Sequence, residues 1–407
     1  MEKDRLTKLE KYWILYDVGN SAFTLLVATI IPIYFNYLAG QEGISEVNYL
    51  AFWGYASSIA TLLVAFLGPV FGTLADTKGF KKPIFLGSLL VGVGGLCVLS
   101  VPMGFVAFLV IFIIAKVGYS CSLVFYDAML SDVTTPERMD RVSSQGYAWG
   151  YIGSCVPFIA SLAVVLFSGL PMQTGMGIAF FINGAWWLLT TVPLLKKYEQ
   201  IHYEPRKPHA VAESFRRLLR VFREIRGDRK IFLFLIAFFF YIDGVYTIID
   251  MATAFGSALG FTSTTLLLAL LLTQIVAFPC ALLFGWLAPK YENGTLIRIC
   301  IVAYGAIALF AVQLDKSWEF WFLAVCVGMF QGGIQALSRA YFAKIIPAEK
   351  SGEYFGLYDI FGKGAAFMGT TLVGFGAQLT GSLNIGVSVI FVLFVIGFLL
   401  FEKAVRA

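Results

Sequence analysis

Residues 142–195 read VSSQGYAWGYIGSCVPFIASLAVVLFSGLPMQTGMGIAFFINGAWWLLTTVPLL and contain no Asp, Glu, Lys or Arg. A helix needs about 20 apolar residues to cross the hydrocarbon core of a bilayer, so this stretch is long enough for two crossings. The Ser-Gly-Leu-Pro sequence at 168–171 interrupts it and predicts the turn between them. Further uncharged runs cover 48–75, 83–115, 251–289 and 364–401. The chain is therefore predicted to cross a membrane many times.

The overall composition agrees with this prediction. Of 407 residues, 59% are hydrophobic and only 14% are charged, and the mean hydropathy is +0.80. A soluble domain carries about 25% charged residues. Membrane strands are short and alternate strictly, whereas these runs are continuous, so helices are expected. The cysteines lie in the apolar spans without metal-ligand spacing, which predicts core residues with no disulfide, metal or cofactor role. They are Cys97, Cys121, Cys155, Cys280, Cys300 and Cys326.

The apolar pattern predicts an all-α membrane protein with about twelve transmembrane helices in two pseudo-symmetric six-helix bundles. The bundles are predicted at 1–195 and 231–407, joined by a basic cytoplasmic linker at 196–230. The predicted spans are 12–38, 49–75, 83–101, 105–132, 142–167, 176–195, 231–256, 264–289, 295–313, 318–345, 354–378 and 383–402.

The distribution of Lys and Arg predicts the orientation. With both termini in the cytoplasm, nearly all of the 30 basic residues fall in cytoplasmic segments, and Lys316 is the one in an outside loop. This topology explains the net charge of +5 without nucleic acid. The charged start, residues 1–11, leads into a full-length span and does not read as a cleavable signal peptide. The compact loops are typical of a prokaryotic plasma-membrane protein.

The linker contains an amphipathic stretch. Phe215, Leu218, Leu219 and Phe222 share a helical face, and arginines occupy most of the other positions. This pattern is typical of a helix on the cytoplasmic membrane surface, or of a basic tether held near anionic lipid.

Polar residues recur at matching places in the two halves, as expected for internal repeats. The first and seventh spans carry polar stripes with the same i, i+3, i+4, i+7 spacing: Asp17, Asn20, Ser21 and Thr24, and Asp243, Tyr246, Thr247 and Asp250. Transporters built from repeated halves place their site where the repeats meet. A central cavity lined by spans one, four, seven and ten is therefore predicted.

Charged residues inside spans are the main candidates for function, because each costs ~2.5–3.5 kcal/mol at mid-helix and tends to face a cavity or a partner. They are Asp17, Lys116, Asp127, Asp132, Asp243, Asp250, Arg339, Asp359 and Lys363. Shallow Asp132 and Arg339 are expected to form structural pairs at helix ends. The i, i+4 spacing of Asp359 and Lys363 suits an ion pair, with function the equal alternative.

Asp243 and Asp17 are the strongest functional acids. A buried carboxylate can take up and release a proton as solvent access alternates, or bind a cation or a substrate ammonium. The alternative is that such an acid is a fixed partner of Lys116 or Arg339. Lys116 could itself hold a substrate carboxylate or neutralise an acid. Both histidines, at 202 and 209, lie in the linker and so cannot carry protons within the membrane.

The loop GTLADTKGFKK at 72–82 resembles the signature loop of the major facilitator superfamily, G-x-x-x-D-R/K-x-G-x-R/K-R/K. Gly72, Asp76, Gly79, Lys81 and Lys82 match the pattern, and a Thr stands at 77 where a base is usual. The resemblance implies that this cytoplasmic loop latches the two halves together, as a gate.

Longer motifs resemble the vacuolar effluxer-like branch of that superfamily. They are WILYDVGNSAF at 13–23, YDAML at 126–130, RVSSQGYAWGYIG at 141–153, YIDGVYTI at 241–248, QGGIQALSR at 331–339 and EYFGLYDIFGK at 353–363. Eukaryotic members are associated with releasing amino acids from the vacuole. Carried over by position, the resemblance points to Asp17, Asn20, Asp243, Gln331, Gln335, Arg339, Asp359 and Lys363. Asp127 departs from the Asn that is commoner there.

These observations predict a secondary transporter that moves an amino acid or a similar small zwitterion by alternating access, with proton coupling as a further hypothesis. We expect it to work as a monomer. The alternative is an exporter or flippase of a lipid-like or drug-like amphiphile. The sequence contains no P-loop for ATP, and the spans contain no histidine and no nucleophile motif. An intramembrane enzyme or a receptor is therefore not expected.

Overall fold

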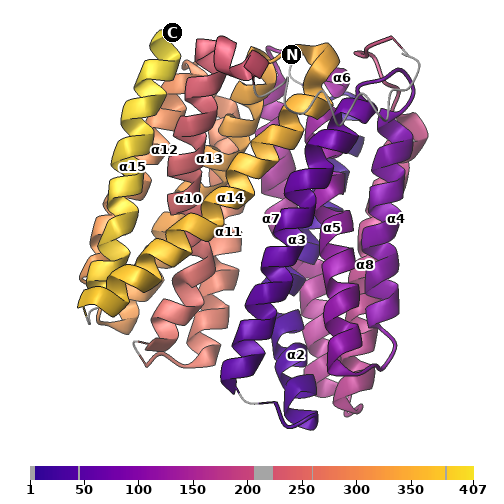
Figure 1. The fold of residues 1–407 in the computed structure, drawn as a ribbon, viewed down its shortest axis with the longest axis vertical. Helices are drawn as coiled ribbons and strands as arrows, with labels where there is room; N and C mark the ends of the chain where they lie inside the picture. The colour runs from indigo at the N-terminus through magenta and orange to yellow at the C-terminus, as the bar shows by residue number, and fades with distance from the viewer. Residues whose placement is uncertain (1–4, 45, 206–222, 259, 381–382) are drawn as a thin grey trace. The chain divides into compact units, whose positions relative to one another are not determined.

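The computed structural model describes residues 5–44, 46–205, 223–258, 260–380 and 383–407, and these residues are nearly all helical (Figure 1). The first half contains α1 (Lys8–Ala28), α2 (Ile30–Gln41), α3 (Glu46–Ala75), α4 (Lys81–Leu99), α5 (Phe105–Ala128), α6 (Leu130–Val133), α7 (Met139–Phe167) and α8 (Met172–Lys197). The second contains α10 (Arg229–Ala258), α11 (Ser263–Leu287), α12 (Asn293–Val312), α13 (Ser317–Ile345), the 3-10 turn η2 (Ala348–Lys350), α14 (Ser351–Thr380) and α15 (Leu383–Arg406).

By length and composition, 11 helices among the described residues could cross a membrane, with α1 and α2 counted as one. Helix α14, with 30 residues, covers the predicted span at 354–378. The all-α membrane fold predicted from sequence is therefore confirmed. The amphipathic stretch at 215–222 lies outside the described residues.

Two predicted spans differ in detail from the structure. The span at 12–38 consists of two helices, because the helix breaks at Thr29. The hydroxyl of Thr29 donates to the carbonyl of Leu25 at 2.5 Å, and Pro32 has no N–H to donate to the preceding turn. The span at 105–132 ends as α5 at Ala128, and the short helix α6 follows it.

The chain folds into two compact units. Unit 1 comprises residues 1–133, 149–215 and 348–357, and unit 2 comprises 134–148, 216–347 and 358–407. Each unit therefore takes in one short segment from the other half of the sequence. These segments are the first turns of α14 in unit 1, and the first turns of α7 in unit 2.

Close helix packing forms the core of each unit. In unit 1, α4 packs against α5 and α8, and a Cβ on Gly118 of α5 would come within 2.5 Å of the Gly92 nitrogen of α4. In unit 2, α10 packs along α15, where a Cβ on Gly397 would come within 2.8 Å of the Tyr241 side chain. Small residues let membrane helices approach this closely.

Candidate functional site

The predicted gate loop, residues 72–82, joins α3 to α4 in unit 1. Its turn requires glycine at position 79, where φ is +80°. Its other glycine marks a close contact, because a Cβ on Gly72 would lie 2.3 Å from the carbonyl oxygen of Gly352. The first turn of α14 therefore packs directly on the gate loop.

Asp76 holds that first turn. Its side chain is buried, and its two oxygens accept hydrogen bonds from the amides of Gly352 at 2.7 Å and Glu353 at 2.9 Å. The first amides of a helix have no partner within the helix and carry its positive dipole end, so a carboxylate is well placed there. Asp76 thus caps α14.

Burial raises the pKa of Asp76 to about 7, well above the ordinary value of an aspartate. The nearby charge of Lys81 and the two amide hydrogen bonds oppose this rise, while Glu204 adds to it. The cap can therefore gain or lose a proton near neutral pH.

Lys81 is the second anchor of the gate loop. Its fully buried ammonium lies 3.1 Å from Asp132 and donates to the hydroxyl of Ser351 at 2.9 Å. The structural pairing expected for Asp132 is confirmed. Lys82 instead donates to the carbonyl of Tyr198 at 3.4 Å, just past the end of α8.

A polar cluster around Asp17 lies deeper in unit 1. One oxygen of Asp17 accepts from the amide of Asn20 at 3.1 Å, and the other accepts from the hydroxyl of Tyr126 at 2.8 Å. The Tyr126 ring stacks on Trp13 with 4.2 Å between ring centroids, which fixes its position. The structure thus brings together Asp17 and Asn20, which the sequence predicts to share a helix face.

The two other candidates of unit 1 are half-buried. The ammonium of Lys116 lies 5.8 Å from the centre of the Phe112 ring, one helical turn away. Asp127 follows Tyr126 at the end of α5. The two roles that the sequence offers for Lys116, binding the solute or neutralising an acid, stay predictions.

Asp243 lies at the centre of the corresponding cluster in unit 2. Its side chain is fully buried on α10, and one oxygen accepts from the Gly369 amide at 2.9 Å and from the Thr247 hydroxyl at 3.3 Å. Within the described residues, its second oxygen accepts no hydrogen bond. Both recorded donors are neutral, so Asp243 is not held as the fixed partner of Arg339.

Arg339 is bound elsewhere in unit 2. It is buried on α13, and its guanidinium donates to the hydroxyl of Ser143 at 2.9 Å and to the Ser143 carbonyl at 3.1 Å. It also stacks 4.3 Å from the centre of the Tyr147 ring. Gln331 and Gln335 precede it by two turns and one turn on the same helix face, and both are buried.

The remaining candidates of unit 2 lie on α10 and α14. Asp359 and Lys363 form the ion pair that their spacing predicts, with 2.7 Å between the charged atoms. Tyr246 is half-buried and lies close to Gly362. Asp250 is exposed near the far end of α10.

Asp140 and its partners are not among the site residues predicted from sequence. The carboxylate of Asp140 binds the Lys344 ammonium and the Asn293 side-chain amide, which fastens the start of α7 within unit 2. Asp140 lies just before the predicted span at 142–167 and so falls outside the intramembrane charges. Tyr198 and His202, which bind Asp132, were missed because they lie in the linker.

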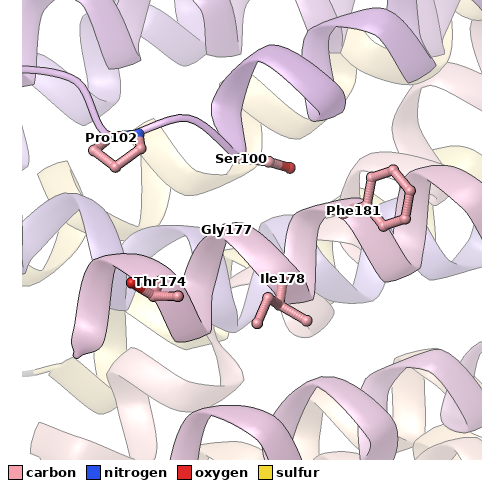
Figure 2. A pocket seen from close by; sticks show the side chains of 6 residues that line it. All are labelled: Ser100, Pro102, Thr174, Gly177, Ile178 and Phe181. Carbon is pink, nitrogen blue, oxygen red and sulfur yellow. The ribbon is translucent and has the colours of Figure 1, made fainter. Parts of the chain in front are cut away.

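A pocket of about 300 Å³ lies away from these charges, between the end of α4 and the first turns of α8 (Figure 2). It is lined by Ser100, Pro102, Thr174, Gly177, Ile178 and Phe181. This largely apolar lining carries no charge and includes none of the predicted site residues.

Solved structures of other proteins share this fold. The transporter FucP in its outward conformation matches with a TM-score of 0.74 over 98% of this chain and 97% of its own, at 13% identity. The human organic anion transporter MFSD10 matches with a TM-score of 0.68 over 97% and 98%, at 15% identity. The fold is therefore that of a major facilitator superfamily transporter.

Sequence comparison places the chain within this superfamily. The family model described as "Vacuole effluxer Atg22 like" matches residues 7–137 and 131–406, so the chain belongs to the Atg22-like family. An uncharacterized MFS-type transporter of Bacillus subtilis, YxiO, is 42% identical over 97% of this chain and 94% of its own. Autophagy-related protein 22 of Yarrowia lipolytica is 26% identical over 60% of this chain and 46% of its own.

Proposed function

We propose that this secondary transporter moves an amino acid or a similar small zwitterion by alternating access, and that the movement is coupled to protons through Asp243. The observation that carries the proposal is the state of Asp243. It is fully buried, bound only to neutral donors, and one oxygen accepts no hydrogen bond within the described residues.

A carboxylate in such a place is costly as an anion, because burial removes its hydration and no cation replaces it. Binding one proton removes the charge, and releasing it requires renewed access to water. A residue that is buried in one state and hydrated in another therefore carries one proton per cycle. Asp17 is the weaker candidate, because the Asn20 amide and the Tyr126 hydroxyl already stabilise both of its oxygens.

A zwitterion needs partners of both signs. In unit 1, the carboxylate of Asp17, which accepts from the Asn20 amide, suits the ammonium group of the solute. The ammonium of half-buried Lys116, near the Phe112 ring, suits its carboxylate. In unit 2, the glutamines at 331 and 335 and Tyr246 can donate and accept hydrogen bonds without adding charge.

A ligand panel tests the solute class. Purified protein is heated with amino acids, peptides, sugars or lysolipids, and a true solute at ~100 times its Kd stabilises by about 2.7 kcal/mol. We expect a shift in melting temperature with one class of amino acid, lost in Lys116→Met. A shift with lysolipids alone would replace this proposal with transport of an amphiphile.

A further inference from the structure

The segment after α8, residues 198–204, lies on the gate loop, and we call it the strap. Thr77 and Glu204 pair as a parallel β-bridge, in which the Glu204 amide donates to the Asp76 carbonyl at 2.8 Å and the Lys78 amide donates to the Glu204 carbonyl at 3.1 Å. The two main-chain bonds flank the residue that follows Asp76. They fix the peptide groups on both sides of it.

Gln200 adds a second clamp on the same loop. Its side-chain oxygen accepts from the Gly79 amide at 2.9 Å, and its side-chain nitrogen donates to the Ala75 carbonyl at 3.0 Å. The loop between α3 and α4 is not helical, so its backbone groups need partners from elsewhere. The strap supplies partners at positions 75, 76, 78 and 79.

The strap is anchored at Asp132. The hydroxyl of Tyr198 donates to one oxygen of Asp132 at 2.5 Å, and the amides of Ile201 and His202 donate to the other at 3.2 and 2.8 Å. The ring nitrogen of His202 lies 3.1 Å from the same oxygen. Asp132 also binds Lys81, which reaches the first residue of α14.

Two series of contacts connect the strap to the first turn of α14. One runs from Gln200 and Glu204 through the loop backbone to Asp76, and the other runs from the strap through Asp132 and Lys81. We infer that the strap is a positioning element of the cytoplasmic gate, which stays docked on the loop and holds Asp76 in the orientation that caps α14. This inference does not depend on the identity of the solute.

The test measures exposure of the capped turn directly. Ser351 is buried beneath the gate loop, so a Ser351→Cys reporter is labelled by a polar maleimide only when that turn leaves the loop. Labelling is followed by mass in nanodiscs, and protein without the added cysteine gives the background from the native cysteines. The reporter removes the hydroxyl contact to Lys81 in every variant equally.

Gln200→Ala removes both side-chain hydrogen bonds to the loop, and the loss of one alone changes a population about five-fold, so the labelling rate should rise at least that much. Gln200→Glu should also raise it, because a carboxylate can accept from the Gly79 amide but cannot donate to the Ala75 carbonyl. The matched control is Ile201→Ala, since the Ile201 side chain is 59% exposed and only its backbone binds Asp132. It should leave the rate unchanged.

A disulfide provides the reverse test. Thr77→Cys with Glu204→Cys joins the two positions of the β-bridge, and oxidation in the Gln200→Ala background should return the rate to that of the parent. The inference is overturned if both Gln200 variants label like Ile201→Ala, or if the closed disulfide leaves the rate high. Should Gln200→Ala fail to fold, Gln200→Glu with the same disulfide gives the same decision.

Discussion

Each unit contains one short segment from the other half of the sequence: the start of α14 lies in unit 1 and the start of α7 lies in unit 2. The two units bind these segments with opposite chemistry. In unit 1, an acid of the loop, Asp76, binds backbone amides of the incoming helix α14. In unit 2, the incoming helix α7 itself carries the acid, Asp140, and the receiving side supplies Lys344 and Asn293. The first hold depends on where a helix begins, and the second depends on side chains. A side-chain substitution in α14 that keeps the amides of Gly352 and Glu353 therefore leaves the Asp76 contacts in place, whereas Asp140→Asn in α7 removes the charge that binds Lys344.

A buried cation completes each hold by donating to a serine. Lys81 donates to Ser351 in unit 1, and Arg339 donates to Ser143 in unit 2, both at 2.9 Å. The two halves carry similar tripeptides at these places, Leu-Ser-Asp at 130–132 and Leu-Ser-Arg at 337–339. In unit 2 the last residue of the tripeptide is itself the cation, Arg339 on α13. In unit 1 it is an acid, Asp132 on α6, and the cation is Lys81 at the start of α4.

The largest expected effect comes from breaking the buried pair of unit 1. Lys81→Met leaves the Asp132 charge buried without its cation, which destabilises by ~3–5 kcal/mol. The matched control is Lys82→Met, whose ammonium is only partly buried and binds one carbonyl. Unfolding in mixed micelles should separate the two clearly. Equal midpoints for the two variants would show that the Asp132–Lys81 pair contributes little.

The second effect is a dependence on pH that belongs to unit 1. The pKa of Asp76 is about 7 in the capped state and ~3.9 when exposed, so the capped state holds the proton more tightly. Capping is therefore strongest at low pH and weakens as pH rises toward about 7, by up to about tenfold per pH unit.

Labelling at Ser351→Cys, divided by labelling at exposed Glu349→Cys, cancels the ionisation of the thiol itself. We expect this ratio to rise between about pH 5.5 and 7.5, a range that spans the upper part of the titration of Asp76. Above about pH 7.5 the ratio should level off. Asp76→Asn should make it flat. A ratio that falls with pH would contradict the assigned sign.

The third effect tests the side-chain hold of unit 2. Asp140→Asn keeps the shape but removes the charge that binds Lys344, a hydrogen bond to a charged group worth about 1.5–3 kcal/mol. We expect a lower unfolding midpoint that does not worsen when Lys344→Met is added, because the same contact is already lost. Additive effects of the two substitutions would show that they act separately.

The smallest effect compares the two serines. Ser351→Ala and Ser143→Ala each remove one hydroxyl from a buried cation that keeps other partners, so each should cost about 1 kcal/mol. Similar losses in thermal stability would support the equivalence of the two holds. A loss confined to one unit would show that the correspondence is one of sequence alone.

Local and periodic features were predictable from sequence, and long-range ones were not. Uncharged runs predict spans because the bilayer sets their length, and the Asp359–Lys363 pair follows from i, i+4 spacing. Asp17 and Asn20 share a face for the same reason. The contact of Arg339 with Ser143 joins distant segments, and the strap binds backbone groups of the gate loop. Neither of these two contacts produces a recognisable pattern in the amino-acid sequence.

The central claim is that Asp243 carries the coupled proton, and proton flux in proteoliposomes tests it most directly. Once the panel names a solute, an imposed solute gradient is applied and the internal pH is followed with a trapped dye. We expect the parent protein to move protons with the solute, and Asp243→Asn to move solute, if at all, without a pH change. Solute-driven proton flux that persists in Asp243→Asn would contradict the claim.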